Sequence, residues 1–262
     1  MSRITIHNKE DFTKMRKAGK LAAEILDYIA EFVDVGVTTE YLNDVCHEKI
    51  VENGAIPAPL NYKGFPKSIC TSINHVVCHG IPSDKRLKNG DILNIDVTVI
   101  VDGWHGDSSR MYYVGNPSIK AKRLCQVTYD AMMIGIDQVR PGNTFGDIGK
   151  AIQSYVESNG FSVVRDYCGH GIGKVFHAEP SVVHYYDKRN NSILLEEGMF
   201  FTIEPMVNAG GFATILMNDG WTVKTRDKSL SAQFEHTMGV TSSGVEIFTS
   251  SPKGFNFPPY DF

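Results

Sequence analysis

The sequence predicts an α+β fold in which two similar halves share a curved, mainly antiparallel sheet. Three observations lead to this prediction: two pairs of amphipathic helical segments, strands with alternating apolar and polar residues, and a chain that repeats itself. The composition is that of a globular protein, with 42% hydrophobic and 21% charged residues among 262. A chain of this length forms one large domain or two small ones.

Four segments have the periodicity of amphipathic helices. In the first, apolar side chains from Phe12 to Phe32 recur at helical spacing. The second ends at Gly54, a typical helix stop, and Gly160 ends the fourth in the same way. We expect one helix pair in each half. The predicted helices cover residues 11–33, 38–53, 118–139 and 144–159.

The strongest strand prediction covers residues 93–101, where apolar side chains alternate with polar ones such as Asp96. Asp102 and Gly103 follow as a strong signal for a two-residue hairpin turn, so residues 104–114 should return beside this strand. The remaining strands are weaker predictions. They are expected at residues 162–167, 199–207, 222–225 and 234–241.

Two stretches of the first half recur in the second half in the same order. Residues 36–54 align with 142–160, and both stretches begin and end with glycine. Residues 87–96 align with 195–204, with leucine, glycine, an apolar pair, isoleucine and a carboxylate in common. Two matches at nearly the same separation favour an internal duplication. The expected unit is a single domain, residues 1–262, with halves of about 1–115 and 116–262.

Two carboxylates stand in otherwise apolar strands, Asp96 in one half and Glu204 in the other. A buried acid is costly unless something binds it, although for Asp96 alone a water-facing strand surface is an equally good explanation. The hairpin would place Asp96 opposite Ser109 and make Asp107 its diagonal neighbour on the same face. Two like charges at that spacing repel unless they share a cation or a proton.

The second half supplies matching groups. Glu204 takes the place of Asp96 in the repeat, Glu235 stands in a late strand, and His170 lies between two glycines of a loop. Across a pseudo-twofold axis these groups would converge with Asp96 and Asp107. Four carboxylates and one imidazole suit manganese, iron(II), cobalt or zinc, and their charge calls for two divalent ions that activate a water molecule.

Other classes of protein are disfavoured. The net charge of −4 gives no electrostatic reason to expect nucleic acid or an anionic membrane as partner. No apolar run approaches the ~20 residues of a membrane span, and the first residues lack the apolar stretch of a secretory signal. The five cysteines form no C-x-x-C pair and indicate reduced thiols in a cytoplasmic protein. Cys78 and His79 would point to opposite faces of a strand, which disfavours a thiol hydrolase.

Taken together, these residues and the motifs around them make the chain resemble the type I methionine aminopeptidase family over nearly its whole length, and the motifs are highly specific. The resemblance implies the pita-bread fold of creatinases and aminopeptidases, with two pseudo-symmetric halves around a dinuclear metal site. The form expected is bacterial or organellar, because the eukaryotic N-terminal extension and the long type II insert are missing. The motifs are VCHGIP (77–82), GDILNIDVTVIVDGWHGDSSRMY (90–112), GHGIGKVFHAEP (169–180), TIEPMV (202–207) and QFEHTMGVT (233–241).

The resemblance implies a role for each metal ligand. Asp96 is similar to the bidentate ligand of one metal, and Asp107 and Glu235 to carboxylates that bridge both. His170 and Glu204 are similar to the ligands of the other metal. Glu204 would also accept and shuttle the proton of the metal-bridging water, which attacks the first peptide bond.

Two further histidines match residues of the family that are not ligands. His79 would lie near the scissile amide, and His177 would contact the substrate carbonyl. The family's methionine pocket corresponds to Tyr62, Phe65, Cys70, Phe176 and Trp221, with Pro59 where relatives often have cysteine. A monovalent-cation site would use backbone oxygens of Asn74, Val76 and Ser231.

The implied activity is removal of the initiator methionine from nascent proteins whose second residue is small. The expected partners are nascent N-termini, met at the ribosome in the cytoplasm, and the expected state is a monomer. Two rival functions remain. A proline-specific peptidase of the same fold shares the five ligands, but the pocket and the missing N-terminal domain disfavour it. A non-enzymatic binding protein on this fold is disfavoured by the intact ligand set.

Overall fold

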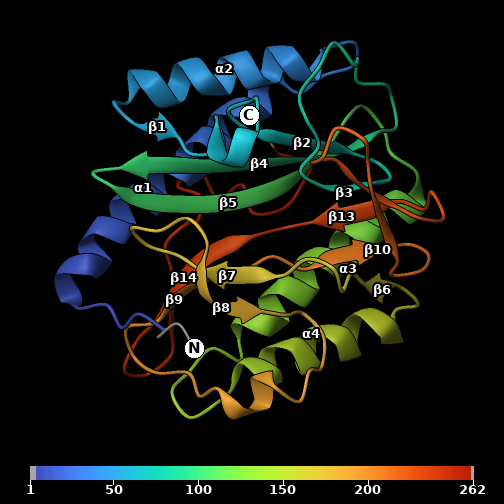
Figure 1. The fold of residues 1–262 in the computed structure, drawn as a ribbon. Helices are drawn as coiled ribbons and strands as arrows, with labels where there is room; N and C mark the ends of the chain where they lie inside the picture. Colours follow the sequence, from blue (N-terminus) through green and yellow to red (C-terminus); the bar gives the residue numbers. More distant parts are fainter. Residues whose placement is uncertain (1–3, 261–262) are drawn as a thin grey trace.

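In the computed structural model, which describes residues 4–260, two helix pairs enclose the strands (Figure 1). The pair α1 and α2 covers the strands of the first half, and α3 and α4 cover those of the second half on the opposite side. The predicted one pair per half is confirmed. The helices are α1 (Lys9–Ile29), α2 (Thr39–Glu52), α3 (Ile119–Ile136) and α4 (Phe145–Ser158), with 3-10 turns η1 (Ala30–Phe32), η2 (Tyr62–Gly64) and η3 (Asn190–Ser192).

The second helix of each pair begins and ends in the same way. The hydroxyl of Thr38 caps α2 by accepting from a backbone amide, and Thr144 caps α4 likewise. At α4 the carboxylate of Asp147 also accepts from the amide of Thr144, which completes a capping box. Gly54 and Gly160 follow the helix ends with φ of 70° and 79°, a conformation that favours glycine.

The hairpin of the first half has the predicted register. Val101 lies opposite Trp104 and Asp96 opposite Ser109. Asp102 turns the chain at a φ of 50°, as a two-residue hairpin turn requires. The hairpin strand β4 also pairs with two short strands, β1 and β2. The strands of this half are β1 (Ile56–Pro57), β2 (Cys70–Ile73), β3 (Val76–Cys78), β4 (Ile92–Val101) and β5 (Trp104–Tyr113).

The second half has more and shorter strands than the sequence predicts. The expected strand 199–207 is interrupted at Glu204 and Pro205, because proline cannot donate to a strand ladder. The expected strand 234–241 starts only at His236, and the expected strand 162–167 shrinks to Ser162–Val163. The strands are β6 (Ser162–Val163), β7 (Gly169–Gly171), β8 (Ala178–Val182), β9 (Phe200–Ile203), β10 (Met206–Asn208), β11 (Thr214–Leu216), β12 (Val223–Thr225), β13 (Ser231–Gln233), β14 (His236–Val240) and β15 (Val245–Ile247).

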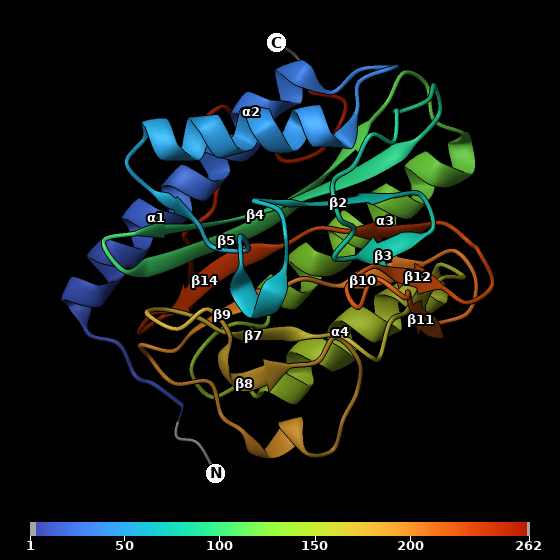
Figure 2. The same cartoon turned by 45° about the horizontal axis from the view of Figure 1, so that its top comes forward.

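Within residues 4–260, the strands form four hydrogen-bonded groups instead of one continuous sheet. The group β15-β14-β9-β7-β8 belongs to the second half, and β4 with its neighbours β1, β2 and β5 belongs to the first. A bridge between Ser109 and Glu235 joins these two groups where β5 passes the start of β14. Figure 2 shows the two groups side by side between the helix pairs. This junction positions the site described below.

His170 lies on a strand, β7, and not on the free loop that the sequence suggested. Its flanking glycines are needed because other backbone comes close. A Cβ on Gly169 would lie 2.3 Å from the carbonyl oxygen of Thr202, and a Cβ on Gly171 would lie 2.1 Å from that of Glu179. The glycines therefore fix the histidine in the sheet.

The two halves repeat the same contacts at matching positions. Thr38 bridges Arg86 in the first half, and Thr144 bridges Leu194 in the second. The amide next to each bridge forms an equivalent hydrogen bond, from Leu87 to Val37 and from Leu195 to Asn143, both at 2.8 Å. Thr38, Val37 and Leu87 correspond to Thr144, Asn143 and Leu195 in the sequence alignment of the halves, and Arg86 and Leu194 stand one residue before its second stretch, so the contacts support the duplication. The boundary near residue 115 stays a prediction.

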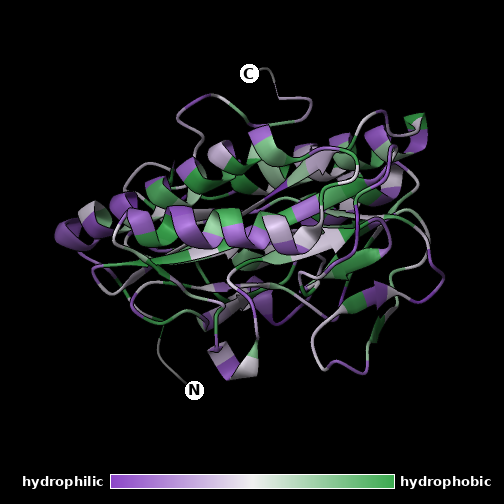
Figure 3. Cartoon of the chain, turned by 90° about the horizontal axis from the view of Figure 1, so that it is seen from above, coloured by the Kyte–Doolittle hydropathy of each residue, from purple (hydrophilic) through white to green (hydrophobic). Residues whose placement is uncertain are grey.

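Each helix pair covers a hydrophobic core of its own. One core joins α1 and α2 to β4, with Leu26, Ile50 and Ile95 fully buried. The other joins α3 and α4 to β9 and β14, around Phe145 and Phe201. Hydrophilic and hydrophobic segments alternate along the helices in Figure 3, as expected of amphipathic helices. Within residues 4–260, no helix is both long enough and apolar enough to cross a membrane.

Candidate active site

A cavity of about 370 Å³ contains every site residue that the sequence singled out as catalytic, ligating or methionine-binding. Strands and loops of both halves line it, so it belongs to the junction of the halves. The lining includes Tyr62, Phe65, Cys70, His79, Asp96, Asp107, His170, Phe176, His177, Glu204, Trp221 and Glu235. The roles of these residues stay predictions, but their convergence is a structural fact.

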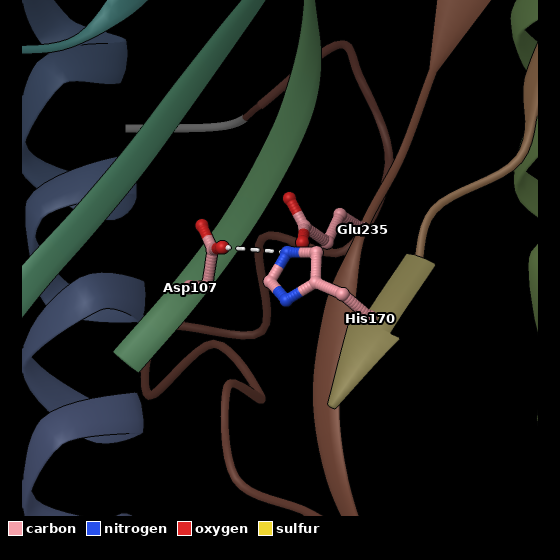
Figure 4. A group of neighbouring side chains, drawn as sticks. All are labelled: Asp107, His170 and Glu235. Carbon is pink, nitrogen blue, oxygen red and sulfur yellow. Dashed lines mark ion pairs between the residues drawn. The ribbon is translucent and has the colours of Figure 1, made fainter. Parts of the chain in front are cut away.

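Three ligand-type side chains lie in one cluster at the junction (Figure 4). Asp107 comes from β5, His170 from β7, and Glu235 from the short link between β13 and β14. One ligand atom of each lies within 4.8 Å of those of the other two. Backbone contacts hold the link in place, since the Glu235 amide donates to the Ser109 carbonyl at 3.0 Å and the Ser108 hydroxyl donates to the Glu235 carbonyl at 2.7 Å.

Hydrogen bonds orient two of the carboxylates. The Thr98 hydroxyl donates to Oδ1 of Asp107 at 2.7 Å, across the hairpin pair that the register sets opposite each other. Oε1 of Glu204 accepts from the Thr202 hydroxyl at 2.8 Å, and Oε2 accepts from the side-chain amide nitrogen of Gln233 at 3.2 Å. Each bond is made to an oxygen of a group predicted to bind metal. The protein itself therefore orients these two side chains, without help from a bound ion.

Burial makes the ionised form of these acids unfavourable. It raises the pKa of Asp96 and Glu235 well above their usual values, and the neighbouring carboxylates add to the effect. Burial also raises the pKa of Glu204 to about 7, although the nearby His170 works in the opposite direction. Acids in such a cluster need either a proton or a cation.

The tautomer of His170 fits a cation in the cluster. Its Nδ1 lies 3.1 Å from the Gly171 carbonyl oxygen, which can only accept, so Nδ1 carries a proton. In a neutral ring the Nε2 lone pair would face Oδ2 of Asp107 at 3.5 Å and Oε1 of Glu204 at 3.6 Å, which is repulsive. Despite its burial, which acts in the opposite direction, the hydrogen bond to Asp107 and the nearby carboxylates raise the pKa of His170, so without metal a second ring proton supplies the positive charge at Nε2, and a bound cation would replace that proton. The oxygen and imidazole donors fit a hard or borderline divalent metal.

Two further histidines flank the cluster without being part of it. The ring of His177 lies 4.2 Å from that of His170, and its Nδ1 forms a 3.0 Å hydrogen bond with the Tyr62 hydroxyl. Partial desolvation and the charge of His170 lower the pKa of His177 to about 4, so this ring is neutral at pH 7. His79 lies 6.3 Å from Trp221 and has a φ of 55°, which takes its side chain off the line of β3.

Another part of the cavity wall is apolar. The rings of Phe65 and Trp221 meet edge to face at 5.2 Å, and those of Tyr62 and Phe176 lie 4.9 Å apart. Cys70 lies opposite Asp96 in the sheet, which places this wall directly beside the carboxylates. Burial raises the pKa of the Cys70 thiol well above its usual value, so the thiol stays neutral. This wall has the character expected of a pocket for an apolar side chain.

The expected monovalent-cation site lies where β3 meets β13. The Ser231 amide donates to the Asn74 carbonyl at 2.8 Å, and Val76 begins β3 next to them. The three residues are thus close together in the structure. Their use as cation ligands stays a prediction.

Several residues of the site gave no signal in the sequence. Thr98, Thr202 and Gln233 are buried partners of the acids. His184 is fully buried, and its Nε2 accepts from the Glu204 amide at 3.0 Å, which holds the backbone at the break between β9 and β10. Hydrogen bonds of this kind depend on the folded backbone, and only the position of Thr98 across the hairpin could have been read from the predicted register.

Comparison with known proteins gives the family. Residues 13–242 match the sequence profile of Metallopeptidase family M24. This chain belongs to metallopeptidase family M24. A methionine aminopeptidase of Rickettsia prowazekii is 69% identical to it over 258 residues, which cover 98% of this chain and 99% of the relative. A methionine aminopeptidase of Escherichia coli is 56% identical over 248 residues, 94% of each chain. The resemblance seen in the sequence is confirmed.

Solved structures of this family have the same fold. The crystal structure of methionine aminopeptidase from Rickettsia prowazekii covers 94% of this chain and all of its own chain, with a TM-score of 0.92 and 69% identity. The enzyme from Thermotoga maritima has a TM-score of 0.91 at 36% identity, covering 94% of this chain and 99% of its own. A prolidase from Pyrococcus furiosus reaches 0.74 at 22% identity and covers 93% of this chain and 65% of its own, which shows the fold alone. The expected pita-bread fold is confirmed.

Proposed function

We propose that this chain is a metal-dependent aminopeptidase that removes methionine from the N-terminus of polypeptides whose second residue is small. One observation carries the proposal: the ligand-type residues and the apolar wall line the same cavity. A metal-binding cluster beside an apolar pocket can bind a peptide's first side chain and present its first amide bond for hydrolysis. Identities of 69% and 56% over nearly the whole chain to enzymes named methionine aminopeptidase support this specificity.

The five predicted ligands would hold two divalent metal ions, of cobalt, manganese, iron(II) or zinc. When bound, such ions polarise a carbonyl and lower the pKa of a water molecule from 15.7 toward ~7. Asp107 comes from the first half and Glu235 from the second, and their ligand atoms lie within 4.8 Å of each other. Both carboxylates would therefore be shared by the two ions. The ligands are Asp96, Asp107, His170, Glu204 and Glu235.

Glu204 is suited to accept and release the proton of the attacking water. Its Oε1 accepts from the Thr202 hydroxyl and its Oε2 from the Gln233 side-chain amide, so the carboxylate is held facing the cluster, within reach of a water molecule there. His177 would donate a hydrogen bond to the carbonyl oxygen as negative charge develops there. His79, beside Trp221, would lie near the scissile amide.

The first side chain of the substrate would enter the apolar wall. Tyr62, Phe65, Phe176 and Trp221 provide ring surfaces, and Cys70 leaves space for an unbranched chain with a polarisable sulfur. Pro59 lies at the same cavity and would form part of its rim. We expect methionine and norleucine to fit, and β-branched or charged side chains to be excluded.

The same proposal covers where and on what the enzyme acts. The substrates would be nascent polypeptides, met at the ribosome in the cytoplasm, and the enzyme would act as a monomer. The monovalent cation at Asn74, Val76 and Ser231 would stabilise the junction of β3 and β13. These statements rest on the proposed activity.

Hydrolysis of a peptide series by the metal-loaded protein tests the proposal. Peptides of the form X-Ala-Ser should be cleaved well when X is methionine or norleucine, and poorly when X is isoleucine or lysine. An Ala-Pro peptide tests the proline-specific alternative. Equal kcat/KM for Lys-Ala-Ser and Met-Ala-Ser would show that the pocket is wrongly assigned, and preferential cleavage of Ala-Pro would support a prolidase. Cleavage of none of them would favour a binding protein.

A further inference from the structure

We propose that Tyr62 is a positioning residue whose hydroxyl fixes the tautomer of His177, with the ring proton on Nε2. The inference deepens the proposed function and rests on it, because it assigns the state of the imidazole that would contact the substrate carbonyl. It gives Tyr62 a second role besides that of a ring in the apolar wall.

The contact is well formed. The Tyr62 hydroxyl lies 3.0 Å from Nδ1 of His177, and the two rings stack with centroids 5.3 Å apart at an angle of 24°. Phe176 packs against both rings, at 4.9 Å from Tyr62 and 4.1 Å from His177. Within residues 4–260, Nδ1 is the His177 ring nitrogen that bonds to protein. Nε2 is left for the cavity.

The chemistry of the pair determines where the proton lies. A neutral imidazole has one N–H and one lone pair, and a phenol hydroxyl can donate to that lone pair. If Nδ1 carried the ring proton, the lone pair of Nε2 would face the carbonyl oxygen on which negative charge develops. That arrangement is repulsive. When the Tyr62 hydroxyl donates to Nδ1, the proton lies on Nε2, where it can be donated to the substrate.

The backbone around Tyr62 is held in an uncommon conformation. Asn61 and Lys63, on either side of it, have φ values of 66° and 48°. Non-glycine residues persist in this region when the surrounding structure requires it, and such residues cluster at functional sites. The Asn61 amide donates to the Phe65 carbonyl at 2.8 Å, and the Lys63 ammonium lies 5.2 Å over the Tyr62 ring. These contacts hold the turn that carries Tyr62 and place the Lys63 ammonium over its ring.

His177 is also held from the other side. Phe176 stacks on His105 of β5, with centroids 5.4 Å apart at an angle of 17°. The His105 amide donates to the Gly173 carbonyl at 2.9 Å, which ties the chain before Phe176 to the hairpin. The backbone contacts at Asn61 hold Tyr62, the stack on His105 holds Phe176, and Phe176 packs against both rings of the pair, so the hydrogen bond joins two groups that are each held in place. It joins a loop of the first half to a loop of the second.

The tautomer can be measured directly. In the zinc-loaded protein, long-range ¹H–¹⁵N spectra of labelled histidine distinguish the two nitrogens of each ring, and His177→Gln assigns the signals. We expect the wild-type His177 to carry its proton on Nε2, and Tyr62→Phe to shift the ring toward a mixture of tautomers. A wild-type ring protonated on Nδ1, or the same tautomer in both proteins, would overturn the proposal. This readout does not depend on activity.

Kinetics separate positioning from pocket binding. For Met-Ala-Ser, Tyr62→Phe should lower kcat by about tenfold, the order expected for one hydrogen bond, with little change in KM because the ring remains. In a His177→Ala background the same change should have no further effect on kcat. A loss of equal size in both backgrounds, or a loss in KM alone, would contradict the proposal. If the metal-loaded wild type itself does not cleave the peptide, the proposed function fails while the tautomer result still stands.

Tyr155→Phe is the matched control. It removes another tyrosine hydroxyl, which donates to Asp130 at 3.0 Å between α4 and α3, away from the cavity. We expect this variant to leave both the His177 tautomer and kcat unchanged. A change in either would mean that the effects at Tyr62 reflect general loosening of the fold.

Discussion

Glu235 is a buried acid and Asp96 and Glu204 are partly buried ones, and the neighbours of all three are other acids, which determines how the site behaves at the scale of single residues. Burial and the adjacent carboxylates raise the pKa of each of them. In the folded chain without metal, a proton substitutes for the missing positive charge. A metal ion must displace that proton before it can bind.

The first prediction is that metal stabilises the fold more strongly as the pH rises. The pKa of Glu204 is about 7 in the folded chain against a usual 4.5, so this group favours the folded state below the usual value, and the contribution is lost as the pH rises toward 7. Zinc should therefore increase Tm more at pH 7.5 than at pH 5.5. Glu204→Gln, which cannot titrate, should reduce that difference, and an equal increase at both pH values would count against the account.

A second prediction separates the two neighbouring histidines. His170 offers Nε2 to the carboxylate cluster, whereas the Nδ1 of His177 is occupied by Tyr62. His177→Ala should bind metal nearly as well as the wild type and lose kcat by ~10²–10³, as expected when one donor to a developing negative charge is removed. His170→Ala should lose metal outright. Metal analysis of both purified variants decides, and the reverse result would mean that the two roles are exchanged.

At this scale the sequence predicted the charged groups and missed their partners. Asp96 and Asp107 could be placed on one face because the register of a two-residue hairpin is fixed by its turn. The bonds from Thr202 and Gln233 to Glu204 could not be predicted, because they arise where strands of the second half break. Ordinary polar residues become functional there through backbone geometry.

At the scale of elements, helix α1 packs unusually close to strand β5 of the hairpin. Gly106 of β5 lies so near the helix that a Cβ on it would be 2.2 Å from the backbone of Ala18. The hairpin carries Asp96 and Asp107, so this contact also supports the site. A side chain at position 106 can be accommodated only if α1 moves away from β5.

The third prediction tests that contact. Gly106→Ala should lower the free energy of unfolding by about 1–3 kcal/mol, the usual cost of overpacking. Gly244→Ala is the control, because nothing lies within 4 Å of its added Cβ, and it should change stability by less than about 0.5 kcal/mol. Urea denaturation measures both. Similar stability of the two variants would show that α1 adjusts without cost.

The helices were easier to predict than the strands for a physical reason. Long amphipathic segments with caps, such as α2 and α4, contain their own local signals. Strands of two or three residues, such as β7 and β10, exist only because distant segments pair with them. The breaks at Glu204 and Glu235 are part of the site, so the prediction failed where function requires an irregular backbone.

At the scale of the whole molecule, the C-terminal segment is joined to the first half through one buried carboxylate. Asp27 of α1 forms an ion pair with Arg110 of β5, and both are 2% exposed. Asp27 also accepts from the Ser251 hydroxyl at 2.7 Å and from the Lys253 amide at 3.2 Å. A helix, the hairpin and the end of the chain therefore meet at a single side chain.

The fourth prediction is that Asp27→Ala strongly destabilises the fold. The change leaves the Arg110 guanidinium buried without its partner, which typically costs about 3–5 kcal/mol. Glu31→Ala is the control, since Glu31 pairs with Lys253 at the surface, and it should cost less than about 1 kcal/mol. Thermal and urea denaturation should rank the two in this order. If Asp27→Ala lowered the free energy of unfolding no more than Glu31→Ala, the C-terminal segment would stay packed on the first half without this carboxylate.

The central claim is that the junction of the two halves is a metal centre for amide hydrolysis, and removal of metal tests it most directly. The protein is stripped with a chelator, its metal content is determined, and hydrolysis of Met-Ala-Ser is followed as each divalent metal is titrated back. We predict no hydrolysis without metal and recovery that is complete at two equivalents per chain. Full activity in protein shown to contain no metal would contradict the claim.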